Sequence, residues 1–169
     1  MIDRDYTTSD SVPATTPGLQ EIVRSRYPKM QIFHQLEDRE IEQLLPCFEL
    51  NHYPAQTPVF REGDNGDYIG FVLTGRLKVI KATPFPDHHV VLATVGQNSF
   101  VGEFSMLDGE RRTATVITLE PSELLLLHRP PLERLFSDHP RTGVKILKGI
   151  NRIVQLRLQK LSERLVAMY

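Results

Sequence analysis

The middle of the chain consists of short β-favouring runs that proline and glycine interrupt at close intervals. Between Phe48 and Val95 the interruptions fall at Pro54, Gly63, Gly66, Gly75 and the loop from Pro84 to Pro86. Glycine-rich turns of this kind need backbone angles that other residues resist. Two later runs, residues 114–119 and 123–128, also have the composition of strands. Many short strands separated by such turns are typical of a sandwich or barrel, so we expect a mainly β fold.

Helical patterns flank this β region. Apolar spacing predicts short helices over residues 18–26, 37–45 and 130–136. Residues 1–17 hold six Ser or Thr, two prolines and few aliphatic residues, which predicts a flexible leader. We therefore expect a leader (1–17), a β domain with its flanking helices (18–139) and a last helix (140–169).

The last helix is predicted to be long, because no proline follows Pro140. Its apolar residues recur at spacings of three and four: Leu147, Ile150, Val154, Leu158, Leu161 and Leu165. A helix of this length spans roughly 40 Å, more than a small barrel can cover. We therefore expect its far part to pair with a twin in a homodimer; the alternative is a helix that lies wholly on its own barrel.

Composition narrows the class of protein. The 169 residues are 40% hydrophobic and 24% charged, which suits a single globular domain. The aliphatic runs are too short to span a bilayer, and the N-terminus lacks a secretory signal pattern, so we expect a cytoplasmic protein. The single Cys47 excludes an internal disulfide, and His88–His89 has no matching carboxylate cluster, so no metal site is expected.

Charge is distributed unevenly. Residues 1–140 carry a balance of −7 and residues 141–169 a balance of +6. A basic last helix could contact nucleic acid, but a solvated helix face explains the same pattern more simply, so DNA binding is the weaker interpretation.

One stretch has residues suited to holding a small phosphate. Gly102 lets the backbone approach a ligand closely, and the amides that open a short helix attract an anion. Arg112 adds a planar fork of donors that matches phosphate oxygens. Glu103 does not suit a phosphate, but its carboxylate could accept hydrogen bonds from a sugar hydroxyl.

This stretch resembles the phosphate-binding cassette of the cyclic nucleotide-binding domain family, which includes kinase regulatory subunits, gated channels and the bacterial catabolite activator protein. The matching residues are Gly102, Glu103, Phe104, Ser105, Met106, Arg112, Thr113 and Ala114. We call residues 100–114 the cassette. It departs from the family pattern in the extra Val101 and in Arg111, which stands where proline is common and could compete for the phosphate. Further likeness in residues 33–45, 58–64 and 67–80 extends the resemblance over roughly residues 30–165.

The resemblance implies a fold and a site. The fold is α+β but mainly β: an eight-stranded antiparallel β-roll, or jelly-roll-like barrel, with N-terminal helices, a short cassette helix and a long C-terminal helix. Glu103 would bind the ribose 2′-hydroxyl and Arg112 the cyclic phosphate. The amides of Ser105 and Thr113 would complete the phosphate cradle. The last helix would cover the base or form the dimer seam, with Arg152, Gln155 and Arg157 as candidate base contacts.

We therefore interpret the chain as a cyclic mononucleotide sensor and not an enzyme, because no nucleophile with its base is apparent. Thr113 favours cGMP slightly over cAMP, since its hydroxyl can accept a hydrogen bond from the guanine amino group. The helix end near Leu161 weakly resembles linkers that run into output domains such as cyclic-di-GMP synthases. The alternatives are a nucleotide-free barrel that binds proteins, a nucleic-acid binder and a cradle for another anion such as cyclic-di-GMP.

Overall fold

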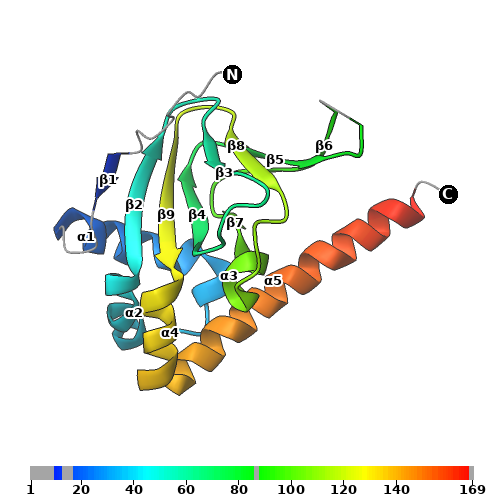
Figure 1. Cartoon of the computed structure of the whole chain (residues 1–169). Helices are drawn as coiled ribbons and strands as arrows, with labels where there is room; N and C mark the ends of the chain where they lie inside the picture. Colours follow the sequence, from blue (N-terminus) through cyan, green and yellow to red (C-terminus); the bar gives the residue numbers. More distant parts are fainter. Residues whose placement is uncertain (1–9, 13–16, 86–87, 168–169) are drawn as a thin grey trace.

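The computed structural model describes residues 10–12, 17–85 and 88–167, and it contains two antiparallel sheets that face each other (Figure 1). The first sheet has the order β1-β2-β9-β4-β7, with strands Asp10–Val12, Phe48–Tyr53, Ser122–His128, Tyr68–Thr74 and Phe100–Val101. The second has the order β3-β8-β5-β6, with strands Pro58–Phe60, Thr115–Thr118, Leu77–Ala82 and His89–Val95. The predicted mainly β roll is confirmed.

Strand β1 corrects one expectation. We expected residues 1–17 to be a flexible leader, but Asp10–Val12 pairs antiparallel with β2, from Asp10 opposite His52 to Val12 opposite Leu50. The open edge of β2 offers unpaired backbone groups, and a short extended segment satisfies them whatever its composition. Residues 1–9 and 13–16 of the expected leader lie outside the described residues.

Strand β9 is buried on both faces, which explains its four consecutive leucines. Leu125 and Leu127 face a core between the first sheet and the helices, together with Phe48 and Phe71. Leu124 and Leu126 face a second core between the two sheets. The first sheet therefore separates a helix-side core from the barrel interior.

The helices gather at one end of the sheets (Figure 1). They are α1 (Pro17–Arg26), η1 (Tyr27–Lys29), η2 (Gln31–Phe33), α2 (Asp38–Leu44), η3 (Leu45–Cys47), α4 (Arg129–Asp138) and α5 (Pro140–Val166), with α3 (Glu103–Asp108) in the cassette. The predicted short helices and the long last helix are therefore present, with shifted ends. Pro140 lies in the first turn of α5, where a missing amide hydrogen costs nothing.

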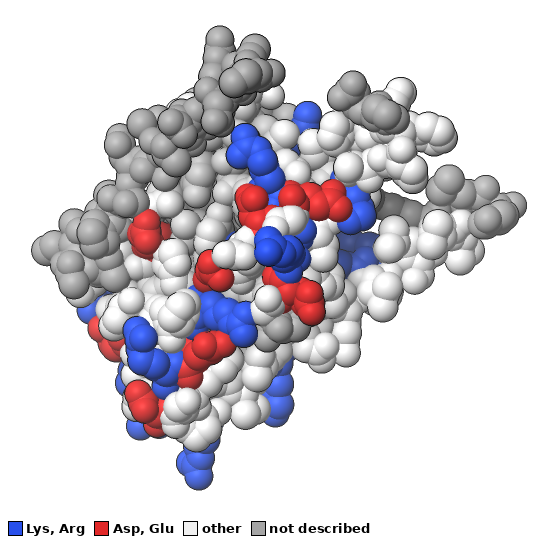
Figure 2. All heavy atoms as spheres, in the orientation of Figure 1, with Lys and Arg blue, Asp and Glu red and all other residues white. Residues whose placement is uncertain are grey.

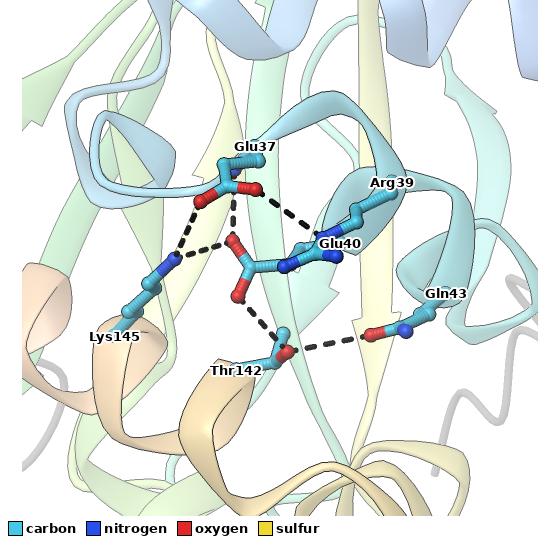
Figure 3. Close-up of polar contacts among 6 residues, drawn as sticks. All are labelled: Glu37, Arg39, Glu40, Gln43, Thr142 and Lys145. Atoms are coloured by element: carbon cyan, nitrogen blue, oxygen red, sulfur yellow. Dashed lines mark hydrogen bonds and ion pairs between the residues drawn. The ribbon is translucent and has the colours of Figure 1, made fainter.

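The start of α5 is fixed to α2 by a buried polar cluster (Figure 3). Glu40 is only 6% exposed, accepts a hydrogen bond from the Thr142 hydroxyl at 3.2 Å and pairs with the Lys145 ammonium at 2.7 Å. Glu40 also takes part in a capping box, in which its carboxylate accepts a hydrogen bond from the backbone amide of Glu37. One turn further on, a Cβ on Gly149 would lie 2.0 Å from the carbonyl oxygen of Ile32. The first third of α5 therefore packs rigidly on α2 and η2.

The far half of α5 projects away from the body, on the same side as the β5–β6 hairpin (Figure 1). Its side chains Leu158, Leu161 and Leu165 are 52–62% exposed. The hairpin carries exposed aliphatic residues as well, among them Val91. The apolar stripe seen in the sequence is thus uncovered over this half of the helix.

Candidate functional site

The cassette helix α3 begins and ends at glycines in the left-handed region. Gly102 at its N-terminus has φ 88° and Gly109 at its C-terminus has φ 78°. A Cβ on Gly102 would also lie 2.4 Å from Nη1 of Arg112 and 3.1 Å from the carbonyl oxygen of Tyr68. Gly102 is therefore required twice, for its backbone angle and for the approach of Arg112.

Arg112 is buried beside this glycine, with 2% of its surface exposed. Its guanidinium donates to the carbonyl oxygens of Gly102 at 3.0 Å and Tyr68 at 2.8 Å. It packs over two aromatic rings, with Cζ 4.1 Å from the centroid of Phe60 and 4.5 Å from that of Tyr68. The rings and carbonyls hold the charged group in the barrel interior.

The charge of Arg112 is not neutralised by an ion pair within the described part of the chain, and its Nε has no hydrogen-bond partner there. Burial lowers the pKa of Arg112, and the neighbouring Tyr68 and Asp67 offset part of that effect. An arginine side chain still keeps its proton at neutral pH. A buried cation with an unpaired donor is suited to an anionic ligand, because such a charge is costly to leave alone.

Glu103 is 3% exposed and lies at the first turn of α3. Its Oε1 accepts a hydrogen bond from Nη1 of Arg157, which comes from α5. Arg157 also donates from Nη2 to the carbonyl oxygen of Phe100 at 2.7 Å, and its Cζ lies 4.4 Å from the Phe100 ring centroid. Arg157 therefore joins the last helix to the cassette.

The other predicted cassette residues divide into buried and exposed. Ser105 and Ala114 are buried. Ser105 packs against the turn at Gly66, because a Cβ added to Gly66 would lie 2.1 Å from the Cβ of Ser105. Phe104 is 58% exposed. Thr113 is exposed, and its carbonyl oxygen accepts from the Lys81 ammonium at 2.6 Å.

Arg111 does not lie beside Arg112 in the barrel. Its side chain is exposed and its Nη1 donates to the carbonyl oxygen of Gly63 at 2.8 Å. The expectation that Arg111 could compete for a phosphate therefore has no support from its position.

Of the three candidate base contacts on α5, Arg157 reaches the cassette. Arg152 turns toward η2, with Nη1 3.3 Å from Nε2 of His34, and Gln155 is exposed. Sequence reasoning did not identify Phe60 and Tyr68 as partners of Arg112, because aromatic residues in β runs usually indicate core packing alone. Nor did it identify the pairing of Arg157 with Glu103, which lies 54 positions earlier.

A metal site, a membrane span and a nucleic-acid surface each place requirements on the described residues. Among them no group of three or more His, Cys, Asp or Glu side chains is arranged to hold a metal ion. No described helix has both the length and the apolar character needed to cross a membrane. On the face shown in Figure 2, basic and acidic side chains are interspersed, which does not resemble a nucleic-acid-binding patch.

Comparison with known proteins gives one consistent family. Residues 50–139 match the family profile of the cyclic nucleotide-binding domain. The cyclic AMP receptor protein of Thermus thermophilus is 33% identical over 98 residues, which cover 58% of this chain and 45% of that protein. The cGMP-dependent protein kinase isozyme 1 of Drosophila melanogaster is 30% identical over 125 residues, which cover 72% of this chain and 16% of the kinase. The chain thus spans less than half the length of either relative.

A solved structure gives the same result. The crystal structure of a cyclic nucleotide-binding domain from Methylobacillus flagellatus KT superposes with a TM-score of 0.77 at 27% identity. The match covers 89% of this chain and 84% of that one.

Proposed function

Because the chain belongs to the cyclic nucleotide-binding domain family, we propose that it is a sensor of a cyclic mononucleotide and acts by binding, not by catalysis. The observation that carries this proposal is Arg112, a cation that is 2% exposed, lies beside the glycine that opens α3 and has an Nε without a hydrogen-bond partner among the residues that the structure describes. Such a group binds a monoanionic phosphate without any change of protonation.

In this proposal each end of the cassette binds a different part of the ligand. Arg112 and the amides of Ser105 and Thr113 bind the cyclic phosphate, close to Gly102. Arg157 holds the carboxylate of Glu103 in place, and this carboxylate accepts a hydrogen bond from the ribose 2′-hydroxyl. The buried position of Glu103 supports this role, since a carboxylate out of water makes stronger hydrogen bonds than an exposed one.

For the base, we propose a small preference for cGMP over cAMP. Thr113 is exposed and directly follows Arg112, so its hydroxyl can accept a hydrogen bond from the guanine amino group. One neutral hydrogen bond of this kind contributes about 1 kcal/mol, which is less than tenfold in affinity. The named relatives include one cAMP receptor and one cGMP-dependent kinase, so they do not choose between the two nucleotides.

Transmission of binding is assigned to α5. Arg157 joins the cassette to this helix, and a ligand shifts the helix only by binding one of its positions more tightly than another. The exposed Leu158, Leu161 and Leu165 fit a seam with a second copy of the chain. An output domain after α5, such as a cyclic-di-GMP synthase, is the corresponding proposal for a longer parent protein.

Isothermal titration calorimetry with cAMP, cGMP and cyclic-di-GMP tests the function, with 5′-GMP as the control for the cyclic phosphate. We expect micromolar binding of a cyclic mononucleotide and none of 5′-GMP. Absence of heat with all the cyclic nucleotides would contradict the proposal and favour a nucleotide-free barrel that binds proteins.

A further inference from the structure

A cavity lies on the helix side of the first sheet, away from the barrel interior. It has a volume of about 220 Å³ and opens between η2, the turn before β7 and one face of α5. Its floor is formed by Ile32, Phe71 and Phe100, which belong to the helix-side core. Arg112 instead packs on Phe60, which belongs to the core between the sheets. The first sheet therefore separates the cavity from Arg112, while Phe100 and Arg157 belong both to the cavity lining and to the contacts of the cassette with α5.

The wall contributed by α5 is amphipathic. Ile153, Leu156, Arg157 and Lys160 follow the i, i+3, i+4, i+7 pattern that places side chains on one face of a helix. The first two residues present apolar surface beside Phe100. Arg157 is already paired with Glu103, so its charge is balanced. Lys160 has neither a hydrogen bond nor an ion pair with any residue that the structure describes, so it is the uncompensated charge of the cavity.

The opposite rim is polar but uncharged. It is formed by Gln31, Asn98 and Ser99, whose side chains have no hydrogen-bond partner within the described ranges. Asn98 is in the left-handed region at φ 65°, which turns the chain into β7 and sets this rim above the apolar floor. The cavity thus combines an apolar floor, free amide and hydroxyl groups, and one unpaired cation at its mouth.

We propose that this cavity binds a small amphipathic carboxylate. The hydrocarbon part packs against Phe71, Phe100 and Ile153, and the carboxylate meets the ammonium of Lys160. The volume is below the roughly 300–1,000 Å³ of pockets that enclose drug-sized molecules, so the ligand is a small acid with a medium-length hydrocarbon chain. This site is additional to the proposed phosphate cradle at Arg112, although Arg157 lines the cavity and also pairs with Glu103.

Calorimetry with octanoate tests the proposal, and 1-octanol is the matched uncharged probe. We expect octanoate to bind about tenfold more tightly than octanol, as one charge-assisted hydrogen bond provides. Lys160→Gln should remove that difference. Lys148→Gln, an exposed lysine of the same helix outside the cavity, should leave octanoate binding within about twofold of the wild type. Leu156→Trp should block both probes by filling the cavity.

An additional variant separates this site from the nucleotide site. Arg112→Ala should leave octanoate binding unchanged, whatever it does to a cyclic nucleotide. The proposal is overturned if neither probe binds, if octanoate and octanol bind equally, or if Lys160→Gln and Lys148→Gln have the same effect. Circular dichroism melting of each variant shows whether a loss reflects unfolding, and a folded Lys160→Gln chain with wild-type octanoate affinity contradicts the assignment.

Discussion

Arg157 of α5 and Glu103 of the cassette form an ion pair in which the carboxylate is 3% exposed and the arginine comes from the outermost helix. At the other end of the same helix, Lys145 pairs with the buried Glu40. Helix α5 is thus attached at its start to the helical base and, three turns later, to the proposed ligand site. The side chain of Arg157 thus links Glu103 to the exposed far half of α5.

The Arg157–Glu103 pair should be measurable as a coupling energy. We expect Arg157→Gln to lower the free energy of unfolding by about 1–3 kcal/mol, because it leaves a buried carboxylate without its charged donor. Glu103→Gln in the Arg157→Gln background should cost much less than it does alone. Urea unfolding of the double-mutant cycle measures this coupling. Arg152→Gln, which alters the contact with His34 instead, is the control; additive effects of the first two changes would refute the coupling.

Two adjacent arginines offer a matched test of the phosphate site. We expect Arg112→Ala to weaken cyclic nucleotide binding by about 10- to 100-fold, the size of a lost charge-assisted contact. Arg111→Ala removes the same charge one residue away. Because the Arg111 guanidinium donates a hydrogen bond to the carbonyl oxygen of Gly63, outside the phosphate site, its loss should change the affinity for a cyclic nucleotide little. Calorimetry on both variants checks this. Similar losses in both would show that general positive charge, and not the buried Arg112, governs binding.

Gly66 is expected to set the position of the cassette. Its added Cβ would lie 2.1 Å from the Cβ of Ser105 and 2.8 Å from the carbonyl oxygen of Glu110. Gly66→Ala should therefore displace α3, lower stability by about 1–3 kcal/mol through overpacking and weaken nucleotide binding. Gly18→Ala is the control, because a Cβ added at Gly18 would meet no atom within 4 Å. Thermal melting and nucleotide titration of both variants test the difference, and an unaffected Gly66→Ala chain would contradict it.

Glu40 gives a pH dependence with a defined sign. Burial raises its pKa, but the hydrogen bond from the Glu37 amide and the contacts from Lys145 and Thr142 outweigh this, so the net pKa lies below its ordinary value of 4.5. A depressed pKa stabilises the fold above pH 4.5, and that contribution is lost as the pH falls through the folded-state pKa.

The test compares Glu40→Gln with the wild type from pH 7 downward. We expect a destabilisation of about 1–3 kcal/mol at pH 7 that shrinks in acid, once the wild-type carboxyl is also protonated. Glu21→Gln, at an exposed position of α1, should show little effect at any pH. A pH-independent loss in Glu40→Gln would mean that shape, and not charge, matters at this position.

The exposed half of α5 predicts association. Light scattering after gel filtration should show a dimer, and Leu158→Glu with Leu161→Glu should convert it to a monomer by placing charge in an apolar seam. Val144→Glu changes a half-exposed residue in the anchored first part of α5 and should leave the dimer intact. A monomeric wild type at high concentration would refute the seam.

The sequence identified the elements that depend on local patterns. Proline and glycine spacing predicted a mainly β sandwich or barrel, and the 3–4 spacing after Pro140 predicted α5, because these signals act over a few residues. Gly102, Glu103 and Arg112 could be selected as site residues for the same reason, since all lie within one short stretch. Strand β1 was missed because its pairing depends on the open edge of β2 and not on its own composition.

By itself, then, the sequence determined the order of strands and helices, a short helix that begins after Gly102 and the residue types of a phosphate cradle. Only the tertiary structure decided that Arg112 packs on Phe60 and Tyr68, that Arg157 and not Arg152 meets Glu103, and that Lys160, without a partner among the described residues, lines a cavity on the helix side. Those contacts join residues that are 44 or more positions apart in most cases. They are set by how two sheets and a long helix pack together, which no local pattern of residues encodes.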